Sequence, residues 1–302
     1  MTTSMQQQAV EHLLSVRDWI RYGVTRLEQS QVVYGQGTDN AWDEAVFLVL
    51  RTLSLPVDQL DPFLDARVLP EERNKLFTVF EKRCTERVPA AYILGESWLA
   101  GLRFEVTPDV LIPRSPISEL IGSQFSPWID ADRVQTIADV CTGSGCLAIL
   151  AALNFPCAKV YATDISKAAL SVATRNVSHY GLESQVELLQ TNLIEALPED
   201  NSCDLIICNP PYVNSTSMAA LPKEFLHEPQ LALAGGNDGM NLIRELFDQV
   251  KTRLHPDGWL ILEIGHEIDN FLAAFPDLNP VWLSTAAAED QIMLLNASEL
   301  TT

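Results

Sequence analysis

The sequence has few basic residues: it carries 20 Lys and Arg against 40 Asp and Glu, for a formal net charge of -20. Such a chain repels phosphate backbones and anionic membranes at long range, and it attracts basic partners. An acidic proteome, as in salt-adapted organisms, produces the same imbalance, so both explanations stay open. The charge argues against recognition of nucleic acid through a basic surface.

Targeting and membrane-spanning patterns are also missing. The first residues, MTTSMQQQAVEHLL, contain neither the basic n-region nor the apolar h-region of a secretory signal. No uninterrupted apolar run approaches the roughly 20 residues that a helix needs to cross a bilayer. We therefore expect a cytoplasmic protein without a membrane partner.

The six cysteines do not follow a tight metal-binding pattern. They are Cys84, Cys141, Cys146, Cys157, Cys203 and Cys208. Two pairs have a C-x4-C spacing, but one pair flanks a glycine turn and the other lies in a strand-like run, whereas structural zinc uses a closer knuckle. Several cysteines fall inside apolar runs. We expect reduced, small core residues and no bound metal.

The first hundred residues have a helical pattern. Apolar residues recur at helical spacing between Val10 and Leu27, polar residues suited to an N-cap precede 41–50, and Pro70 opens a further helix. These patterns predict a small helical domain over 1–95, in which no catalytic cluster is visible. The stretch SWLAGLRFEVTPDVLIP then alternates short β-like runs with turn residues, which predicts a β-hairpin linker over 96–115.

Strand and helix patterns alternate from about residue 134 onwards. Strands are predicted at 135–140, 159–163, 186–190, 204–208, 258–264, 281–285 and 291–295, and helices at 145–154, 167–180 and 241–254. Such alternation builds a mostly parallel sheet with helices on both faces. We therefore expect an α/β domain over 116–302, with its ligands at the carboxyl ends of the strands.

A glycine turn follows the first of these strands, in DVCTGSGCLAI. Gly143-x-Gly145-x-x-Ala148 matches a dinucleotide-binding fingerprint, and the loop enters a helix whose N-terminal amides are free to bind a ligand. Asp164 ends the next strand, where an acid can bind ribose hydroxyls. The turn is compatible with two cofactors, a nicotinamide dinucleotide or an adenosyl cofactor.

The fourth strand ends in DLIICNPPYVNS. An amide nitrogen is a poor nucleophile, and two acceptors on its N–H bonds would position it. The Asn209 side chain can supply one oxygen and the Pro210 carbonyl the other, which Pro211 restricts in conformation. Tyr212 offers a face on which a flat group can stack. This end favours an enzyme that transfers a methyl group from a sulfonium to a planar nitrogen, mainly by positioning.

Together, the stretches NPPY, DVCTGSG, VLIPRSPISELI, HEPQLALAGGNDGM and LILEIG resemble the HemK/PrmB-type protein-glutamine methyltransferases. The resemblance implies a seven-stranded Rossmann-like class I methyltransferase domain after a helical substrate-recognition domain, with S-adenosyl-L-methionine as cofactor. It also implies N5-methylation of a glutamine side chain. Pro113-Arg114-Ser115-Pro116, Cys141 and Cys146 are similar to the PrmB type, which implies large-subunit ribosomal protein three as the substrate.

The resemblance also assigns site residues. The implied cofactor contacts are Thr142, Gly143, Ser144, Gly145, Asp164, Asn192, Leu193 and Asn209. The implied substrate clamp is Asn209, Pro210, Pro211 and Tyr212. Support on the substrate side is implied for Arg114, Glu119, His227 and Glu228. This sequence departs from the family at Asn192 and Leu193, beside the adenine, where an acid and often an aromatic residue are usual.

Three alternatives to this function remain open. One is methylation of the Gly-Gly-Gln glutamine of peptide-chain release factors. Another is a nucleic-acid adenine N6-methyltransferase, against which the acidic charge argues. The last is a ribosome-assembly factor without catalytic activity on the same scaffold.

Overall fold

The computed structural model describes residues 2–197, 199–200 and 202–300. The chain divides into two compact units, one formed by 1–97 with 222–227 and the other by 98–221 with 228–302. The predicted domains 1–95 and 116–302 include residues 1, 198, 201, 301 and 302, which lie outside the described residues. The predicted linker and domain functions stay predictions.

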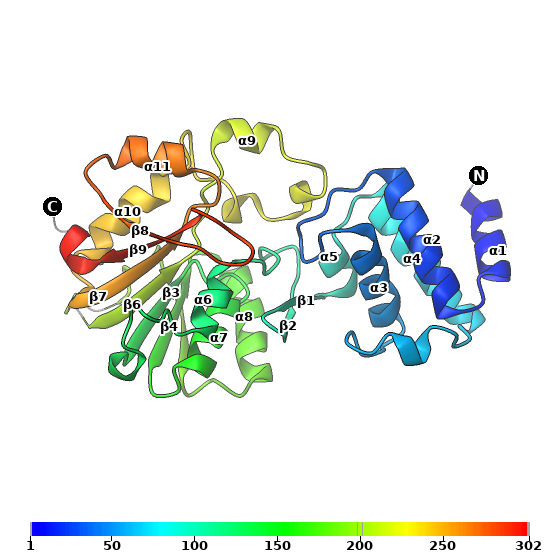
Figure 1. The fold of residues 1–302 in the computed structure, drawn as a ribbon, viewed down its shortest axis with the longest axis horizontal. Coiled ribbons are helices and arrows are strands. Elements are labelled where there is room, and N and C mark those ends of the chain that lie inside the picture. The colour runs from blue at the N-terminus through cyan, green and yellow to red at the C-terminus, as the bar shows by residue number, and fades with distance from the viewer. Residues whose placement is uncertain (1, 198, 201, 301–302) are drawn as a thin grey trace. The chain divides into compact units, whose positions relative to one another are not determined.

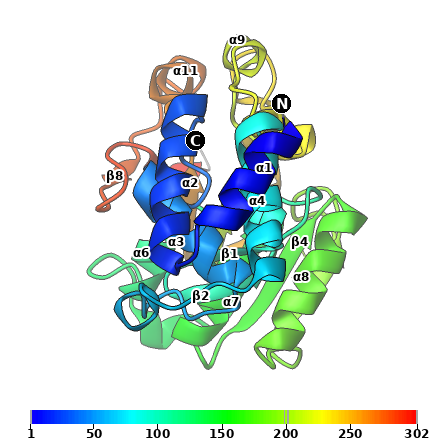
Figure 2. The ribbon, with the colours of Figure 1, turned by 90° about the vertical axis from the view of Figure 1, so that its right-hand side faces the viewer.

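The first unit is helical, as its periodicity predicts. It contains α1 (Thr2–His12), α2 (Val16–Ser30), α3 (Ala41–Thr52), α4 (Pro70–Thr85) and α5 (Ala90–Leu94) (Figure 1), with α1 to α4 seen from another side in Figure 2, and the 3-10 turn η1 (Asp61–Phe63). The apolar pattern from Val10 to Leu27 is split between two helices. The hydroxyl of Ser15 accepts from the Asp18 amide at 3.2 Å, and the Asp18 carboxylate accepts from the Ser15 amide at 2.9 Å. This capping box starts α2 as a new helix.

A buried ion-pair cluster joins three parts of the first unit. Arg83 on α4 is 1% exposed, and its Nε lies 2.6 Å from the carboxylate of Glu44 on α3. The carboxylate of Glu224, in the 222–227 segment, lies 3.5 Å from Arg83 Nη1 and 3.3 Å from Arg87 Nη1. Because these charges are out of water, each depends on the others for compensation.

The chain passes from the first unit to the second within a β-hairpin. Its strands are β1 (Glu96–Leu99) and β2 (Leu102–Glu105), as the sequence predicts. The two turn residues, Ala100 and Gly101, have φ values of 49° and 77°. Positive φ at both central residues matches the right-handed twist of the flanking strands.

A seven-stranded sheet forms the centre of the second unit (Figure 1). Its strands are β3 (Thr136–Val140), β4 (Lys159–Asp164), β5 (Val186–Gln190), β6 (Cys203–Cys208), β7 (Leu254–Glu263), β8 (Val281–Leu283) and β9 (Ile292–Asn296). The order is β5-β4-β3-β6-β7-β9-β8, and β9 runs antiparallel to both of its neighbours. The predicted seven-stranded, mostly parallel Rossmann-like sheet is confirmed.

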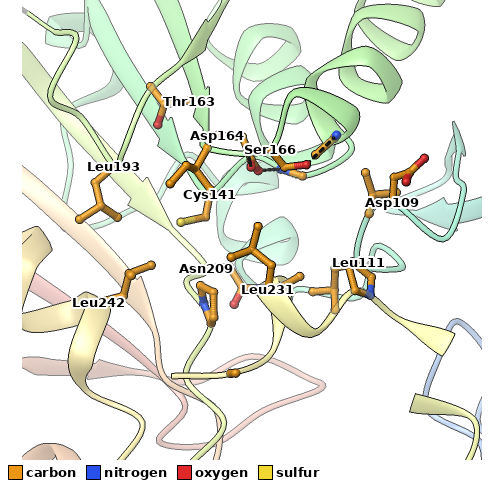
Figure 3. Close-up of a pocket in the computed structure, with 18 of the residues that line it drawn as sticks. Asp109, Leu111, Cys141, Thr163, Asp164, Ser166, Leu193, Asn209, Leu231 and Leu242 are labelled. Carbon is orange, nitrogen blue, oxygen red and sulfur yellow. Dashed lines mark hydrogen bonds between the residues drawn. The ribbon is translucent and has the colours of Figure 1, made fainter. Parts of the chain in front are cut away.

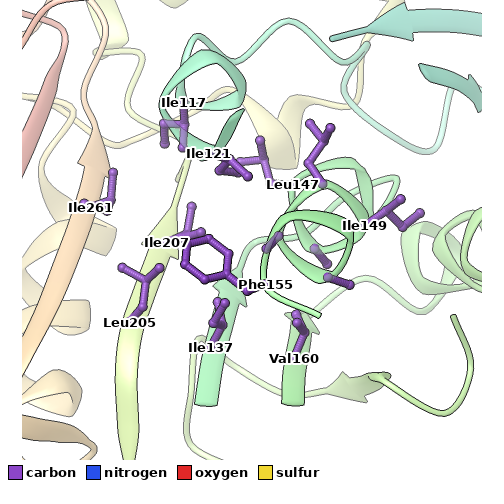
Figure 4. Close-up of a cluster of buried hydrophobic side chains, with 14 of the residues drawn as sticks. Ile117, Ile121, Ile137, Leu147, Ile149, Phe155, Val160, Leu205, Ile207 and Ile261 are labelled. Atoms are coloured by element: carbon purple, nitrogen blue, oxygen red, sulfur yellow. The ribbon is translucent and has the colours of Figure 1, made fainter. Parts of the chain in front are cut away.

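Helices cover both faces of this sheet. α6 (Ile117–Gly122), α7 (Cys146–Asn154) and α8 (Lys167–His179) lie on one face, and α10 (Asn241–Val250) and α11 (Ile268–Ala274) lie on the other. Neighbouring strand residues alternate between the faces, so that Ile137 packs under α7 (Figure 4) and Ala138 packs under α10. Burying an isoleucine side chain such as that of Ile137 stabilises the fold by about 1.5–3 kcal/mol.

Some predicted details are wrong. The helix predicted over 241–254 ends at Val250, because Leu254 already begins β7. Cys157 is exposed, whereas Cys84, Cys146, Cys203 and Cys208 are buried; all six cysteines are free thiols. The short helices α6, α9 (Ser215–Ala219) and α11 were not predicted, since they are too short to show a clear period. Within the described ranges, no helix has both the length and the apolar character to cross a membrane.

Candidate active site

A cavity of about 900 Å³, part of it open to solvent, lies at the carboxyl ends of β3, β4, β5 and β6 (Figure 3). Parallel strands bring their ends to one edge of a sheet, so the residues that follow them meet there. Six of the predicted site residues line this cavity: Gly143, Asp164, Asn192, Leu193, Asn209 and Pro211. All of them belong to the second unit.

The buried carboxyl group of Asp139 binds the loop between β3 and α7 and the first turn of α7. Asp139 is 1% exposed, and it accepts hydrogen bonds from Thr142 Oγ1 at 2.5 Å and from the Ala148 amide at 2.9 Å. Burial raises its pKa to about 7, although both hydrogen bonds oppose the rise. Asp139 was not predicted as a site residue, but it is the first residue of the DVCTGSG motif. Thr142 and Ser144 are buried and Gly145 is the N-cap of α7, and these three are not among the residues that line the cavity.

Asp164 lies where a ribose-binding acid is expected. Its carboxylate accepts from the Gly143 amide at 2.9 Å and from the Ser166 amide at 2.8 Å, and burial raises its pKa. Each carboxylate oxygen has a second lone pair, so Asp164 can still accept from ribose hydroxyls.

Two further observations fit a nucleoside ligand in this cavity. A Cβ added at Gly143 would meet no protein atom within 4 Å, so the space above the loop is open. The hydroxyl of Thr163, which lines the cavity, is buried and has no hydrogen-bond partner among the described residues. The residues present therefore fit an adenosyl cofactor.

Asn192 and Leu193 lie at another side of the cavity, after β5. The Asn192 side-chain nitrogen donates to Glu195 at 3.2 Å and also to Glu245 on α10. Carboxylates only accept, so the amide nitrogen faces them and its oxygen remains available as an acceptor. Leu193 is 3% exposed and has a φ of 49°. The acid usual in the family is thus replaced by an amide whose orientation two nearby carboxylates define.

The Asn-Pro-Pro-Tyr segment follows β6. Asn209 and Pro211 line the cavity, whereas Pro210 is buried beside it. Among the described residues, neither the Asn209 side chain nor the Pro210 carbonyl takes part in a hydrogen bond. The two acceptors predicted to bind an amide –NH2 group, the Asn209 side-chain oxygen and the Pro210 carbonyl oxygen, are therefore available.

Tyr212 is held at its hydroxyl and along its ring. Its OH donates to Glu263 Oε1 at 3.1 Å, and the Ser115 hydroxyl donates to the other oxygen of Glu263. A Cβ at Gly265 would lie 2.5 Å from Tyr212 Cε2, and one at Gly239 would lie 2.2 Å from the Tyr212 carbonyl oxygen. Glycine is therefore needed at both positions, which explains two of the glycines in the AGGNDG and LILEIG stretches.

The carboxyl group that binds the Tyr212 hydroxyl, that of Glu263, is itself buried. Glu263 is 4% exposed, and burial raises its pKa to about 7 against hydrogen bonds from Ser115 and Tyr212 and the charge of Arg114. Burial likewise raises the pKa of Tyr212 well above its usual value. The Tyr212 side chain is therefore neutral, and its hydroxyl donates a hydrogen bond to Glu263. Neither Glu263 nor Ser115 was predicted.

The residues predicted as substrate-side support do not form one group. Arg114 and Glu228 form a two-pronged ion pair, with distances of 2.5 and 2.9 Å. Glu119 is exposed and accepts from the Ala286 amide at 2.9 Å. His227 belongs to the first unit, where its Nε2 lies 3.1 Å from the Glu86 carbonyl oxygen.

Most of the apolar wall was missed. Leu111, Ile165, Leu231 and Leu242 line the cavity, yet they come from four separate segments and share no sequence pattern. The sequence offered some signal for three of them, because Ile165 directly follows Asp164, and Leu111 and Leu231 lie in the VLIPRSPISELI and HEPQLALAGGNDGM stretches.

Comparison with known proteins gives a consistent family. The family model described as "Methyltransferase small domain" matches residues 121–236. A ribosomal protein uL3 glutamine methyltransferase from Bordetella pertussis is 56% identical over 99% of this chain and 100% of its own length. A protein of the same name from Burkholderia pseudomallei is 48% identical over 95% of each chain.

The chain belongs to the ribosomal protein uL3 glutamine methyltransferase family.

A solved structure shows the same fold in a more distant protein. The hMettl16 catalytic domain, in complex with the MAT2A 3'UTR hairpin 1, has a TM-score of 0.50 and 16% identity over 79% of this chain and 85% of its own. At this identity the likeness extends to the fold alone. The predicted resemblance to HemK/PrmB-type glutamine methyltransferases is confirmed by the near-full-length relatives, whereas the individual site residues stay predictions.

Proposed function

We propose that this protein transfers a methyl group from S-adenosyl-L-methionine to the N5 nitrogen of a glutamine side chain in ribosomal protein uL3. One observation carries the proposal: Asp164 and Asn209, predicted to bind cofactor and substrate amide respectively, line the same cavity. The relatives' names supply the substrate. The net charge of -20 suits a basic ribosomal protein, and this substrate would place the enzyme in the cytoplasm.

Residues around the cavity would hold the cofactor. Asp164 would accept from the ribose hydroxyls, and the oxygen of Asn192 would accept from the exocyclic amine of adenine. The buried Thr163 hydroxyl, which lines the cavity, would offer the cofactor a further hydrogen-bonding group. When bound, the cofactor supplies an electrophilic methyl group on a sulfonium.

The chain's own contribution to the reaction is orientation. The Asn209 oxygen and the Pro210 carbonyl would accept the two amide hydrogens, which fixes the nitrogen lone pair towards the methyl group. As the nitrogen gains the methyl group, it would release one of these two hydrogens as a proton to water. Tyr212, held by Glu263, would form a wall for the flat amide. Correct placement alone can contribute about 7–11 kcal/mol to lowering such a barrier, so no strong base is required.

The test is methyl transfer from labelled S-adenosyl-L-methionine to purified uL3, with a release factor offered in a parallel reaction. Label in uL3, located on a glutamine by mass spectrometry, supports the proposal. Label in the release factor alone would show that the release factor, and not uL3, is the substrate. Cofactor binding without any methyl transfer would favour a non-catalytic assembly factor.

Asn209→Ala tests the clamp. We expect turnover to fall about a hundredfold, as is typical when a reacting group is misplaced by about 1 Å, while S-adenosylhomocysteine still binds. Asn154→Ala is a matched control, because that amide bonds the Leu150 carbonyl at the end of α7 and does not line the cavity. Turnover that Asn209→Ala leaves intact would refute the clamp.

A further inference from the structure

Two walls of the cavity come from segments that are far apart in the sequence. One wall is formed by 109–111 and the other by residues between 229 and 234. Figure 3 shows Leu111 from the first wall and Leu231 from the second at the cavity. Neither segment belongs to a strand of the seven-stranded sheet. The hydrogen-bond ladder of the sheet therefore does not fix these walls, although the end of the second wall bonds to the segment after β6, where the Val213 amide donates to the Leu233 carbonyl at 2.8 Å.

An ion pair joins the ends of the two walls. Arg114 Nη1 and Nη2 donate to Glu228 Oε1 and Oε2, at 2.5 and 2.9 Å. The backbone of Ile112 takes part as well, since its amide donates to Glu228 Oε1 at 3.1 Å and its carbonyl accepts from Arg114 Nη1 at 3.3 Å. Glu228 directly precedes the second wall, and Ile112 directly follows the first.

Burial makes this connection strong. The Glu228 side chain has no exposed surface and the Arg114 side chain is 24% exposed. Paired, hydrogen-bonded charges of this geometry are about twice as strong as neutral hydrogen bonds. Removing Arg114 leaves the buried Glu228 carboxylate without its ion-pair partner, which is strongly unfavourable. The ion pair is thus a connection between the two walls that is lost when either charge is removed.

We propose that the Arg114–Glu228 pair is a latch that closes the cofactor cavity and sets the rate at which cofactor and product leave it. The inference rests on the proposed function, because it takes the cavity to be the cofactor site. The two residues act through the walls and are positioning residues. Arg114 is also a charge near the cavity, so the test must separate the latch from simple electrostatics.

Glu228→Gln separates the two effects when two ligands are compared. The glutamine keeps the size of the side chain but cannot accept a two-pronged pair from Arg114 through two anionic oxygens. The positive charge of Arg114, which Glu228 would no longer neutralise, would repel the sulfonium of S-adenosylmethionine, but it would not repel the neutral thioether of S-adenosylhomocysteine. An open latch accelerates release of both ligands.

The measurement is the dissociation rate of each ligand by stopped-flow displacement from the full-length protein. We expect Glu228→Gln to raise both rates about tenfold, with a smaller change in association. Arg114→Lys keeps the charge but offers a point donor, and it should also raise both rates. Glu105→Gln, which breaks an exposed pair with Arg175 in the same unit, should leave the rates unchanged.

Three outcomes would overturn the latch. Wild-type dissociation rates in folded Glu228→Gln and Arg114→Lys, with folding checked by circular dichroism, refute it and leave the proposed function intact. A rise confined to S-adenosylmethionine assigns the effect to charge alone. Failure of the wild-type protein to bind S-adenosylhomocysteine refutes the cofactor site itself, and the latch with it.

Discussion

Glu263→Gln is expected to make the stability of this protein less sensitive to pH. Glu263 ends β7 and is 4% exposed, with Tyr212 and Ser115 donating to its two oxygens. Burial raises its pKa from 4.5 to about 7 in the folded protein. The unfolded chain loses this proton near the ordinary value, so the two states differ in charge between these pH values.

The sign follows from which state holds the proton. Between pH 4.5 and about 7 the folded protein keeps the Glu263 proton while the unfolded chain releases it. Rising pH therefore favours unfolding in this window, and the stability contributed by neutral Glu263 is present below pH 4.5 and lost by about pH 7. At about 1.36 kcal/mol per pH unit, the loss between pH 5 and pH 8 is about 2–3 kcal/mol.

Urea unfolding of the wild-type protein and of Glu263→Gln at pH 5 and pH 8 measures this difference. The free energy of unfolding of the variant, relative to wild type, should rise by about 2–3 kcal/mol from pH 5 to pH 8. Both proteins share every other carboxyl group, including Asp139, so the difference isolates Glu263. A relative stability that does not change between the two pH values would show that Glu263 is ionised in the folded protein over this whole range.

Three other substitutions test further parts of the structure. Gly265→Ala places a Cβ 2.5 Å from the Tyr212 ring, so kcat should fall at least tenfold with cofactor affinity unchanged; a wild-type kcat would show that the ring position is unimportant. Asp164→Asn should weaken S-adenosylhomocysteine binding by about 10- to 100-fold in calorimetry, as expected for lost hydrogen bonds to a charged group, and equal affinity would exclude this acid as a ligand. Arg83→Met leaves Glu44 without its buried partner and should lower the free energy of unfolding by about 3–5 kcal/mol; a loss below about 1 kcal/mol in thermal unfolding would contradict a buried pair.

Local patterns predicted most of the fold. Alternation of strand and helix patterns, with Gly143 after one strand and Asp164 after the next, placed the sheet and one edge of the site. Two predictions that do not depend on a periodic pattern were wrong, namely the end of one helix and the burial of one cysteine. The helix from 241 ends four residues early at Val250, because the Lys251–Arg253 stretch turns into β7, and Cys157 lies on an exposed turn.

The sequence by itself determined the fold class, the family and the Asn209 end of the site, since these depend on short motifs and on neighbours along the chain. Only the tertiary structure paired Ser115 and Tyr212 on Glu263, and Arg114 with Glu228. Ser115 and Glu263 are 148 residues apart, and Arg114 and Glu228 are 114 apart. No periodicity links such positions, because their approach depends on how loops pack at the edge of a sheet. The sequence gives the polar or charged character of these side chains, but only the tertiary structure gives their burial and their partners.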